Sequence, residues 1–350
     1  MNTASRIVIH RAGSYQELKL ERHELPPPGP DEVTISVAAT GVNYADVIVR
    51  MGLYASAKEY VGWPITPGFE VAGTVTAVGS QVQHYKLGDR VLAVTRFGGY
   101  TSRLHVPERQ VFRMPEGLDF VAAASLPAIY FTSFVALRVL TNPRAGDHVL
   151  VHSASGGVGS SLVQLAKELG CVVTGVVGSS HKVELARAMG ADHVIDKSKE
   201  DLWRKAESIA PKGFDLVLDA NGVSTLKQSY NHLRPLGRLV VYGFSAMMPK
   251  VGGRPNYLKL AADYVRTPSF NPLEMVNASR SVLAFNLSYL FERTDILEGG
   301  MEQLLESLQA GTFKPPPAKT YPLADAAQAH RDIESGKTTG KLVLIPTSEA

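Results

Sequence analysis

Cysteine is almost absent from this sequence, because Cys171 is the single cysteine among 350 residues. One thiol excludes an internal disulfide framework, and it also excludes a zinc site built from several thiolates. Cys171 opens the apolar run CVVTGVV, and no electropositive cleft can be argued around it. We therefore interpret it as a small core residue and not as a catalytic nucleophile.

Long runs of one chemical character are also lacking. The N-terminal stretch MNTASRIVIHRAG has no apolar run of signal-peptide length, and the chain nowhere contains the ~18 consecutive apolar residues of a membrane-spanning helix. We therefore expect a cytoplasmic protein without stable membrane insertion. The net charge of +3 comes without a basic stripe, so nucleic acid is not an expected partner.

The composition that is present, 45% hydrophobic and 20% charged, is typical of a globular protein long enough for two domains. Up to about residue 126, segments rich in β-branched residues end at glycine, proline or aspartate, which predicts a β-rich domain. From about residue 127, strand-like and helix-length segments alternate, which predicts a doubly wound parallel sheet. The strand-like segments are DHVLVHSA, CVVTGVVG, DHVIDKS, FDLVLDA, GRLVVYGF and, as a sixth, SVLAFNLSYL at 281–290.

The tail after about residue 291 contains two helical patterns and the closing strand GKLVLIP, and we expect it to fold back onto the β-rich domain. The predicted fold class is α/β, with a Rossmann-type sheet at 127–290 and a β-rich domain formed by 1–126 and 291–350. The connection 245–280 exceeds normal loop length. We expect it to contain a helix and to cover a substrate or contact another subunit; a membrane-surface element is the alternative.

A glycine-rich turn follows the first strand of the second half and opens a helix. Glycine lets the backbone turn tightly and approach a pyrophosphate, and the helix N-terminus then supplies N–H groups and partial positive charge. Alanine replaces the first glycine of the usual pattern, and the strand–turn–helix context favours cofactor binding over simple packing. The turn is Ala154, Ser155, Gly156, Gly157, Val158 and Gly159.

The next strand indicates which nicotinamide cofactor binds. An NAD enzyme places an acid at the end of that strand for the ribose hydroxyls. This chain has Gly178, Ser179, Ser180 and Lys182 there and no acid, and Lys197 follows the third strand. Serine and lysine suit a 2′-phosphate, so the sequence predicts NADPH; a plain surface position is the alternative for each lysine.

With both halves in view, the chain resembles the medium-chain dehydrogenase/reductase superfamily over essentially its whole length. Within it, the resemblance is to the zinc-free quinone oxidoreductases, including the vesicle amine transport protein-like group, and it implies a GroES-like β-rich domain. The matching blocks fall in family order: GVNYADVIVRMGLY (41–54), PITPGFEVAGTVTAVG (64–79), LGDRV (87–91), AGDHVLVHSASGGVG (145–159), LVLDANG (216–222), LRPLGRLVVYGFSA (233–246), AFNLSYL (284–290) and TGKLVLIP (339–346).

Departures from the zinc-dependent relatives bear on the chemistry. Asn43 stands where those relatives have a cysteine ligand, and Phe69 stands before Glu70 where they have a histidine. Their four-cysteine structural cluster is absent, so we expect no metal. Lys197 also departs, because zinc-free relatives often have a tyrosine after the third strand.

The resemblance implies roles for individual residues. Asn43 is expected beside the nicotinamide, its amide holding a cofactor or substrate oxygen; a turn residue is the alternative. Tyr54 is a candidate donor to the substrate oxygen, with packing as the alternative. Asp46 and Arg50 lie one helical turn apart and are expected to pair structurally. Further residues are implied to line the cofactor at the carboxyl ends of strands: Thr132, Asn221, Tyr242, Gly243, Phe244, Phe285, Asn286, Leu287 and Lys341, the last with a surface position as its alternative.

Without a metal, hydrogen bonds alone must stabilise developing negative charge, and a conjugated acceptor suits this. We therefore predict an NADPH-dependent reductase of quinones or α,β-unsaturated carbonyls. The alternative is an NADPH-binding protein with little turnover that acts through partners or membrane surfaces. A zinc-dependent alcohol dehydrogenase is a weaker third interpretation. The family implies a homodimer joined along an edge of the nucleotide-binding sheet.

Overall fold

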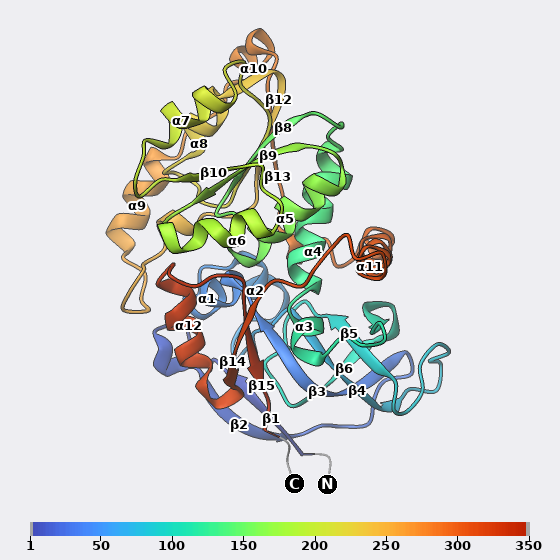
Figure 1. Ribbon diagram of the computed structural model, residues 1–350. Helices are drawn as coiled ribbons and strands as arrows, with labels where there is room; N and C mark the ends of the chain where they lie inside the picture. The colour runs from blue at the N-terminus through green and yellow to red at the C-terminus, as the bar shows by residue number, and fades with distance from the viewer. Residues whose placement is uncertain (1–2, 348–350) are drawn as a thin grey trace. The chain divides into compact units, whose positions relative to one another are not determined.

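The computed structural model describes residues 3–347, and the chain divides into two compact units (Figure 1). Unit 1 comprises residues 1–131, 250–254 and 288–350, and unit 2 comprises residues 132–249 and 255–287. The short stretch 250–254, which lies inside the predicted nucleotide-binding domain, belongs to unit 1. The domain boundaries at 126/127 and 290/291 stay predictions.

Unit 2 is built on a six-stranded sheet in which every pairing is parallel. All six residues of the central strand Phe214–Asp219 are buried, as expected for a sheet covered on both faces. This confirms the Rossmann-type part of the fold prediction. In sheet order the strands are β10 (His193–Asp196), β9 (Val172–Val177), β8 (His148–His152), β11 (Phe214–Asp219), β12 (Leu233–Val241) and β13 (Ser281–Ala284).

Helices connect the strands of this sheet, as the alternating sequence pattern predicts. Glycine closely follows two of them, Gly170 after α5 (Gly157–Glu168) and Gly190 after α6 (Val183–Ala188), both with the positive φ of a helix stop. Asn142, also at positive φ, ends the π-helical segment Val135–Thr141 that continues α4. The connecting helices are α5 (Gly157–Glu168), α6 (Val183–Ala188), α7 (Leu202–Ile209), α8 (Leu226–Asn231), α9 (Tyr257–Arg266) and α10 (Pro272–Ala278), whereas α4 (Pro127–Phe134) precedes the sheet and its residues 127–131 belong to unit 1.

The sixth strand is shorter than predicted. β13 ends at Ala284, and Leu287–Tyr289 forms a 3-10 turn instead of continuing the strand to 290. The reason lies in its neighbour: β12 ends at Val241, which pairs with Ala284, so there is no further strand for the chain to pair with. The expected helix within 245–280 is present as two helices, α9 and α10.

Unit 1 contains a seven-stranded sheet and a separate antiparallel pair. Alternating β-branched residues of three neighbouring strands, among them Val33, Val71 and Val91, form one of its cores. The sheet order is β14 (Ala318–Pro322), β15 (Lys341–Ile345), β3 (Glu32–Val42), β4 (Glu70–Val78), β5 (Arg90–Val94) and β7 (Val111–Arg113), with β6 (Arg103–Pro107) pairing with β3. The separate pair is β1 (Thr3–Val8) with β2 (Lys19–Glu24).

The tail folds back into unit 1, as expected. β15 runs antiparallel to β3, with Leu342 opposite Val42, and β14 is parallel to β15. Helix α12 packs against the first helix of the chain, α1 (Figure 1). The helices of unit 1 are α1 (Tyr44–Arg50), α2 (Ala55–Tyr60), α3 (Phe120–Ala124), α11 (Thr294–Gln309) and α12 (Ala326–Glu334).

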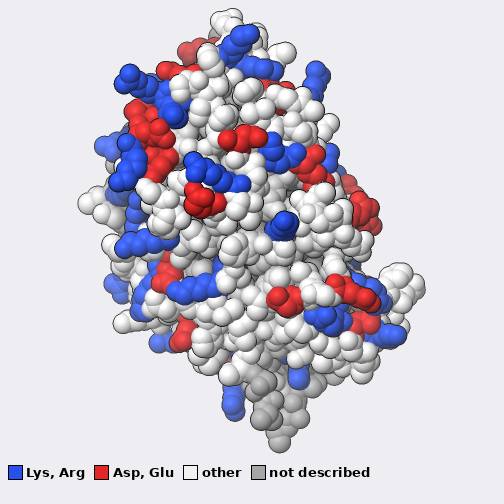
Figure 2. All heavy atoms as spheres, in the orientation of Figure 1, with Lys and Arg blue, Asp and Glu red and all other residues white. Residues whose placement is uncertain are grey.

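The surface carries mixed charge. Figure 2 shows Lys and Arg side chains interspersed with Asp and Glu over the face drawn, without a field of one sign. Across residues 3–347, no helix combines the length and the apolar character needed to cross a lipid bilayer.

Candidate active site

The glycine turn of unit 2 lies where β8 passes into α5. Ser153 takes the left-handed conformation, with φ of +56°, immediately after the strand. A methyl group on Gly159 would lie 2.1 Å from the Ser153 carbonyl oxygen, so only glycine permits this strand–helix contact. Gly156 has an ordinary φ of −82°, and a methyl there would meet only that same oxygen, at 3.4 Å. Gly159 therefore serves packing, whereas Gly156 leaves the face of the turn open.

The first turn of α5 faces this open side. The leading N–H groups of a helix have no acceptor within the helix, and they carry its partial positive charge. Gly157 and Val158 begin this twelve-residue helix, and Ser155 precedes it as a buried residue. The turn therefore has the features of an anion cradle that the sequence predicts.

Two lysines follow the strands β9 and β10: Lys182 closes the 3-10 turn Ser180–Lys182 after β9, and Lys197 comes directly after β10. Lys182 is only 8% exposed, and burial together with the charge of Lys197 lowers the pKa of its ammonium group. Mutual repulsion between two cations at one sheet edge is relieved by a bound anion, and the predicted 2′-phosphate supplies one. Gly178 and Ser179 lie beside them, with the Ser179 hydroxyl 3.2 Å from a ring nitrogen of His181.

Ser180 differs from the prediction. Its hydroxyl donates to Asp196 at 2.6 Å, so it does not join Ser179 and Lys182 in facing a phosphate. Asp196 also accepts from the N–H and hydroxyl of Ser198, and the hydrogen bonds from Ser180 and Ser198 lower the pKa of its carboxyl group. This acid ends β10 and not β9, and serines already occupy its oxygens.

Asn221 lies near the turn, two residues after β11. Its Oδ1 accepts from the Ser153 hydroxyl at 3.3 Å, and its backbone N–H donates to Asp219 at 2.8 Å. Its Nδ2 is buried and has no hydrogen-bond partner among residues 3–347. A buried amide left without an acceptor is costly, so this atom fits a ligand that brings one.

The other predicted cofactor-lining residues of unit 2 follow strands, except Thr132, which lies in α4. The rings of Tyr242, directly after β12, and Phe285, directly after β13, stack with centroids 6.4 Å apart. Gly243 follows Tyr242, Leu287 opens the 3-10 turn after β13, and Thr132 lies buried in α4. Their roles toward a cofactor stay predictions.

A second polar cluster lies in unit 1, around Asn43. Asn43 Nδ2 donates to Glu70 Oε1 at 2.8 Å, and the Lys341 ammonium donates to Asn43 Oδ1 and lies 2.6 Å from Glu70 Oε1. Because an ammonium group only donates, the amide can take one orientation here. Lys341 is 3% exposed and Glu70 fully buried. Lys341 is therefore a buried partner of Asn43, and the surface alternative is wrong.

Behind Asn43, the carboxylate of Asp46 is fully buried. It accepts the backbone N–H groups of Asn43 and Gly68, each at 2.8 Å. Burial raises the pKa of Asp46 to about 7. The predicted pairing of Asp46 with Arg50 is wrong, because Arg50 instead forms a buried ion pair with Glu334 at 2.7 Å. Since that glutamate comes from α12, the local helical spacing gave no sign of it.

Tyr54 stands immediately before α2. Its ring makes edge contacts with Phe69 at 5.9 Å and with Phe97 at 6.4 Å between centroids. These contacts support its packing alternative, while the role of proton donor stays a prediction.

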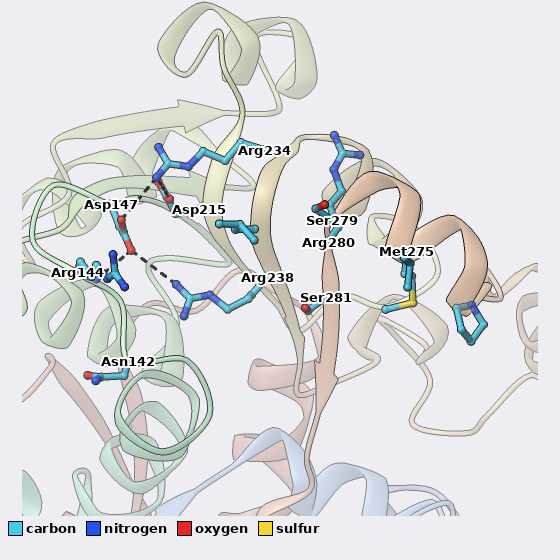
Figure 3. A pocket seen from close by; sticks show the side chains of 13 residues that line it. Asn142, Arg144, Asp147, Asp215, Arg234, Arg238, Met275, Ser279, Arg280 and Ser281 are labelled. Carbon is cyan, nitrogen blue, oxygen red and sulfur yellow. Dashed lines mark hydrogen bonds and ion pairs between the residues drawn. The ribbon is translucent and has the colours of Figure 1, made fainter.

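Unit 2 also has a cavity at the amino ends of the sheet strands, whereas the glycine turn lies at their carboxyl ends. It measures about 810 Å³ and lies beside Asp147, which precedes β8, and Asp215, near the start of β11. Figure 3 shows Arg234 and Arg238 pointing toward these aspartates, with Arg234 paired to Asp215 and Arg238 3.6 Å from Asp147, whereas Arg280 points upward in the view and does not approach them. Because Arg234 and Arg238 are already paired with these aspartates, we do not assign the cofactor to this cavity.

Comparisons with known proteins match this two-part architecture. The family model "Alcohol dehydrogenase GroES-like domain" matches residues 29–116, and "Zinc-binding dehydrogenase" matches residues 189–344. The synaptic vesicle membrane protein VAT-1 homolog of Homo sapiens is 35% identical over 98% of this chain and 86% of its own length. A quinone oxidoreductase of Pseudomonas aeruginosa is 34% identical over 98% of this chain and 100% of its own length.

Solved structures agree. The Escherichia coli quinone oxidoreductase complexed with NADPH superposes with a TM-score of 0.85 at 29% identity, covering 98% of this chain and 100% of that one. The human VAT-1 homolog-like protein gives 0.83 at 27% identity, with full coverage of both chains. The chain belongs to the medium-chain dehydrogenase/reductase superfamily. Within that superfamily it falls among the quinone oxidoreductase-like members, as the sequence resemblance implies.

The residues of this dehydrogenase/reductase do not fit a catalytic zinc ion at Asn43. An amide and a carboxylate are there joined by the Lys341 ammonium, which offers no lone pair and repels a second cation. Within the described part of the chain, no three His, Cys, Asp or Glu side chains gather as a metal-binding group. We therefore derive no step through zinc.

Proposed function

We propose that this protein is a zinc-independent, NADPH-dependent oxidoreductase that transfers hydride to a quinone or to an α,β-unsaturated carbonyl compound. The observation that carries the proposal is the Lys341 ammonium held against Asn43 and Glu70, at the position where zinc-dependent relatives have a metal ligand. A fixed cation beside a fixed amide is suited to stabilising an oxyanion without a metal.

The residues that would hold NADPH are those of the glycine turn, the Lys182 and Lys197 pair, and Asn221. The open face of Gly156 and the first turn of α5 suit a pyrophosphate, the lysine pair suits a 2′-phosphate, and the unpartnered Nδ2 of Asn221 suits an acceptor atom. NADPH supplies a hydride when bound. A quinone oxidoreductase solved with NADPH is among the similar structures.

The chain's own contribution to the reaction centres on Asn43. Nδ2 of an amide carries two hydrogens, one of which Asn43 gives to Glu70. We assign the second hydrogen to the oxygen of the acceptor, on which negative charge grows. Lys341 holds Oδ1 and so makes the amide a better donor. Curated relatives named quinone oxidoreductase and 2-haloacrylate reductase support an activated acceptor of this kind.

The test is protein-dependent oxidation of NADPH with a panel of quinones, enones and 2-haloacrylates, with NADH in parallel and a chelator present throughout. We expect turnover that prefers NADPH and is insensitive to the chelator. Lys182→Ala and Lys197→Ala are expected to remove the preference, and Lys199→Ala, an exposed lysine on the same loop, is the matched control. A preference for NADH, or activity that disappears with the chelator, would contradict the proposal.

The second candidate function is NADPH binding with little turnover, in a protein that acts through partners or membrane surfaces. Helix α9 favours it, because Tyr257, Leu258, Tyr264 and Val265 are all more than 60% exposed on this chain. The VAT-1 relatives are named as synaptic vesicle membrane proteins. Tight NADPH binding without turnover on any acceptor of the panel would favour this function over the first.

The predicted homodimer also belongs to the proposal. β13 is an edge strand of the unit 2 sheet, so its outer side is available to pair with another strand. Sedimentation equilibrium is the direct test, and a monomer at micromolar concentration would contradict the predicted assembly.

A further inference from the structure

A chain of buried polar side chains runs from helix α12 to the Asn43 cluster, entirely within unit 1. His330 Nδ1 lies 3.3 Å from Arg50 Nη1, and its Nε2 lies 3.2 Å from the Tyr100 hydroxyl oxygen. That hydroxyl lies 3.1 Å from Asp46 Oδ2. All four side chains are fully buried. The same Asp46 oxygen accepts the backbone N–H of Asn43 at 2.8 Å.

The chemistry of the members fixes the direction of these hydrogen bonds. A guanidinium group only donates, so His330 must accept from Arg50 at Nδ1 and carry its hydrogen on Nε2. Burial and the charge of Arg50 push the pKa of His330 well below its usual range, which keeps the ring neutral. His330 therefore donates to the Tyr100 oxygen, and Tyr100 donates its own hydrogen to Asp46. Every hydrogen bond in the chain points toward the Asp46 carboxylate.

Asp46 meets donors on all sides. Oδ1 accepts from Gly68 N–H, and Oδ2 accepts from Asn43 N–H and from Tyr100. A protonated Asp46 would bring a fourth hydrogen into a site that offers only donors, so it would break the chain at Tyr100 or at Asn43. The charged and titratable groups that act on Asp46 or on Tyr100 beside it come from several elements: Lys341 on β15, Glu70 on β4, Arg50 on α1 and His330 on α12, with Glu334 of α12 paired to Arg50.

We infer that Tyr100 and His330 are positioning residues for the reaction. They hold the ionised Asp46 carboxylate against the Asn43 backbone. In this way they fix the Asn43 amide, which is also hydrogen-bonded to Lys341 and Glu70. This inference rests on the proposed function for the role of Asn43. The geometry of the hydrogen-bonded chain from His330 to Asp46 does not depend on the role of Asn43, so the inference and the proposed function can be tested separately.

The inference gives the reaction an acidic limit. Since burial raises the pKa of Asp46 to about 7, the donor chain is complete above neutral pH and is interrupted below it. Removal of the Tyr100 hydroxyl takes away one hydrogen bond to the charged form, which raises a carboxyl pKa by about one pH unit or more. The acidic limb of the pH profile should move by the same amount.

The principal variant is Tyr100→Phe, and Tyr321→Phe is its matched control. The Tyr321 hydroxyl also donates a hydrogen bond to an aspartate in unit 1, Asp332 at 2.5 Å, but Tyr321 is not part of the hydrogen-bonded chain that leads to Asp46. For a one-unit shift, Tyr100→Phe is expected to lower kcat/KM about fivefold at pH 7 and to leave it nearly unchanged at pH 9. The NADPH dissociation constant should stay within twofold. An unchanged profile, or a loss equal at both pH values, would overturn the inference.

A second readout works without any turnover. The carboxyl ¹³C resonance of Asp46, followed by NMR in protein labelled at aspartate, reports its titration directly. We expect a midpoint near 7 in the natural protein and an upward shift of about one pH unit in Tyr100→Phe. If the enzyme shows no reductase activity but the Asp46 resonance shifts, the proposed function fails, whereas the hydrogen-bonded chain from His330 to Asp46 is supported. If the resonance does not shift, the inference fails whatever the activity.

His330 is tested by rescue. His330→Leu removes both ring nitrogens, whereas His330→Gln keeps a donor that can reach the Tyr100 oxygen. We expect His330→Leu to reproduce the alkaline shift of the acidic limb and His330→Gln to restore it at least in part. Equal profiles for the two variants would contradict the positioning role. Should His330→Leu fail to fold, Tyr100→Phe and His330→Gln still decide the question.

Discussion

Alanine substitutions at two glycines of the same turn should have different effects: Gly159→Ala should lower stability, and Gly156→Ala should weaken NADPH binding. At Gly159 the new methyl would lie 2.1 Å from the carbonyl oxygen of Ser153 and 2.7 Å from its carbon, both backbone atoms that cannot rotate away. Overpacking of this kind costs about 1–3 kcal/mol, and the better helix propensity of alanine returns about 1 kcal/mol. We expect Gly159→Ala to lower the free energy of unfolding by up to about 2 kcal/mol.

At Gly156 the balance is different. The φ of −82° is open to alanine, and the nearest atom to its methyl lies at 3.4 Å. Stiffening of the unfolded chain gains about 0.4–1 kcal/mol, and the loss of a favourable N-cap residue costs a similar amount, so stability changes by less than about 1 kcal/mol. The methyl does, however, occupy the face offered to a pyrophosphate. We expect the NADPH dissociation constant to rise at least tenfold.

The assays are urea denaturation for stability and isothermal titration calorimetry for NADPH affinity, with both variants measured in parallel. Gly299→Ala in α11 is the control, because nothing lies within 4 Å of its added methyl. Normal NADPH binding by Gly156→Ala would show that this turn does not cradle the pyrophosphate. Unchanged stability of Gly159→Ala would show that the close strand–helix contact is not required.

Three further predictions follow from buried groups. Lys341→Met leaves the buried Glu70 carboxylate without its cation and should cost about 3–5 kcal/mol in urea denaturation, much of which Lys341→Met with Glu70→Gln should recover. Because the pKa of Asp46 is raised to about 7 in the folded state, the unfolded chain loses this proton first as pH rises. The natural protein should therefore lose about 2–3 kcal/mol of stability relative to Asp46→Asn from pH 5 to pH 7, and a constant difference would refute the raised pKa. Burial raises the pKa of the Cys171 thiol to about 11, so iodoacetamide should label it only after unfolding, and rapid labelling of the native protein would contradict its place in the core.

The sequence predicts the parallel sheet and the glycine turn because their cues are local. Strand, glycine turn and helix follow one another within 148–168, and the pattern carries its own physical reason. The contact of Ser180 is not visible in the sequence, because its partner Asp196 lies on the next strand and the sequence does not show which way a hydroxyl turns. The sequence pattern overestimates the length of the sixth strand, because the end of β12 limits how far the strand can pair.

The sequence does not predict the contacts of the unit 1 cluster, because they join residues that lie far apart along the chain. Asn43 stands out from the family pattern, but its partner Lys341 is 298 positions away, and Arg50 meets Glu334 across 284 positions. The helical spacing predicts Asp46 as the ion-pair partner of Arg50, but Arg50 pairs with Glu334 of α12, which is far away in sequence. The buried histidine that directs the hydrogen bonds carries no motif of its own.

The antiparallel pairing of β15 with β3 sets an order of events during synthesis. By the time residue 287 has emerged from the ribosome, all six strands of the unit 2 sheet exist, and that unit can complete its own fold. The unit 1 sheet must still wait for β14 and β15, with part of one edge of β3 unpaired meanwhile. The grip of Lys341 on Asn43 is thus among the last contacts to form, so an incomplete chain can acquire the nucleotide-binding unit but not the candidate reducing site.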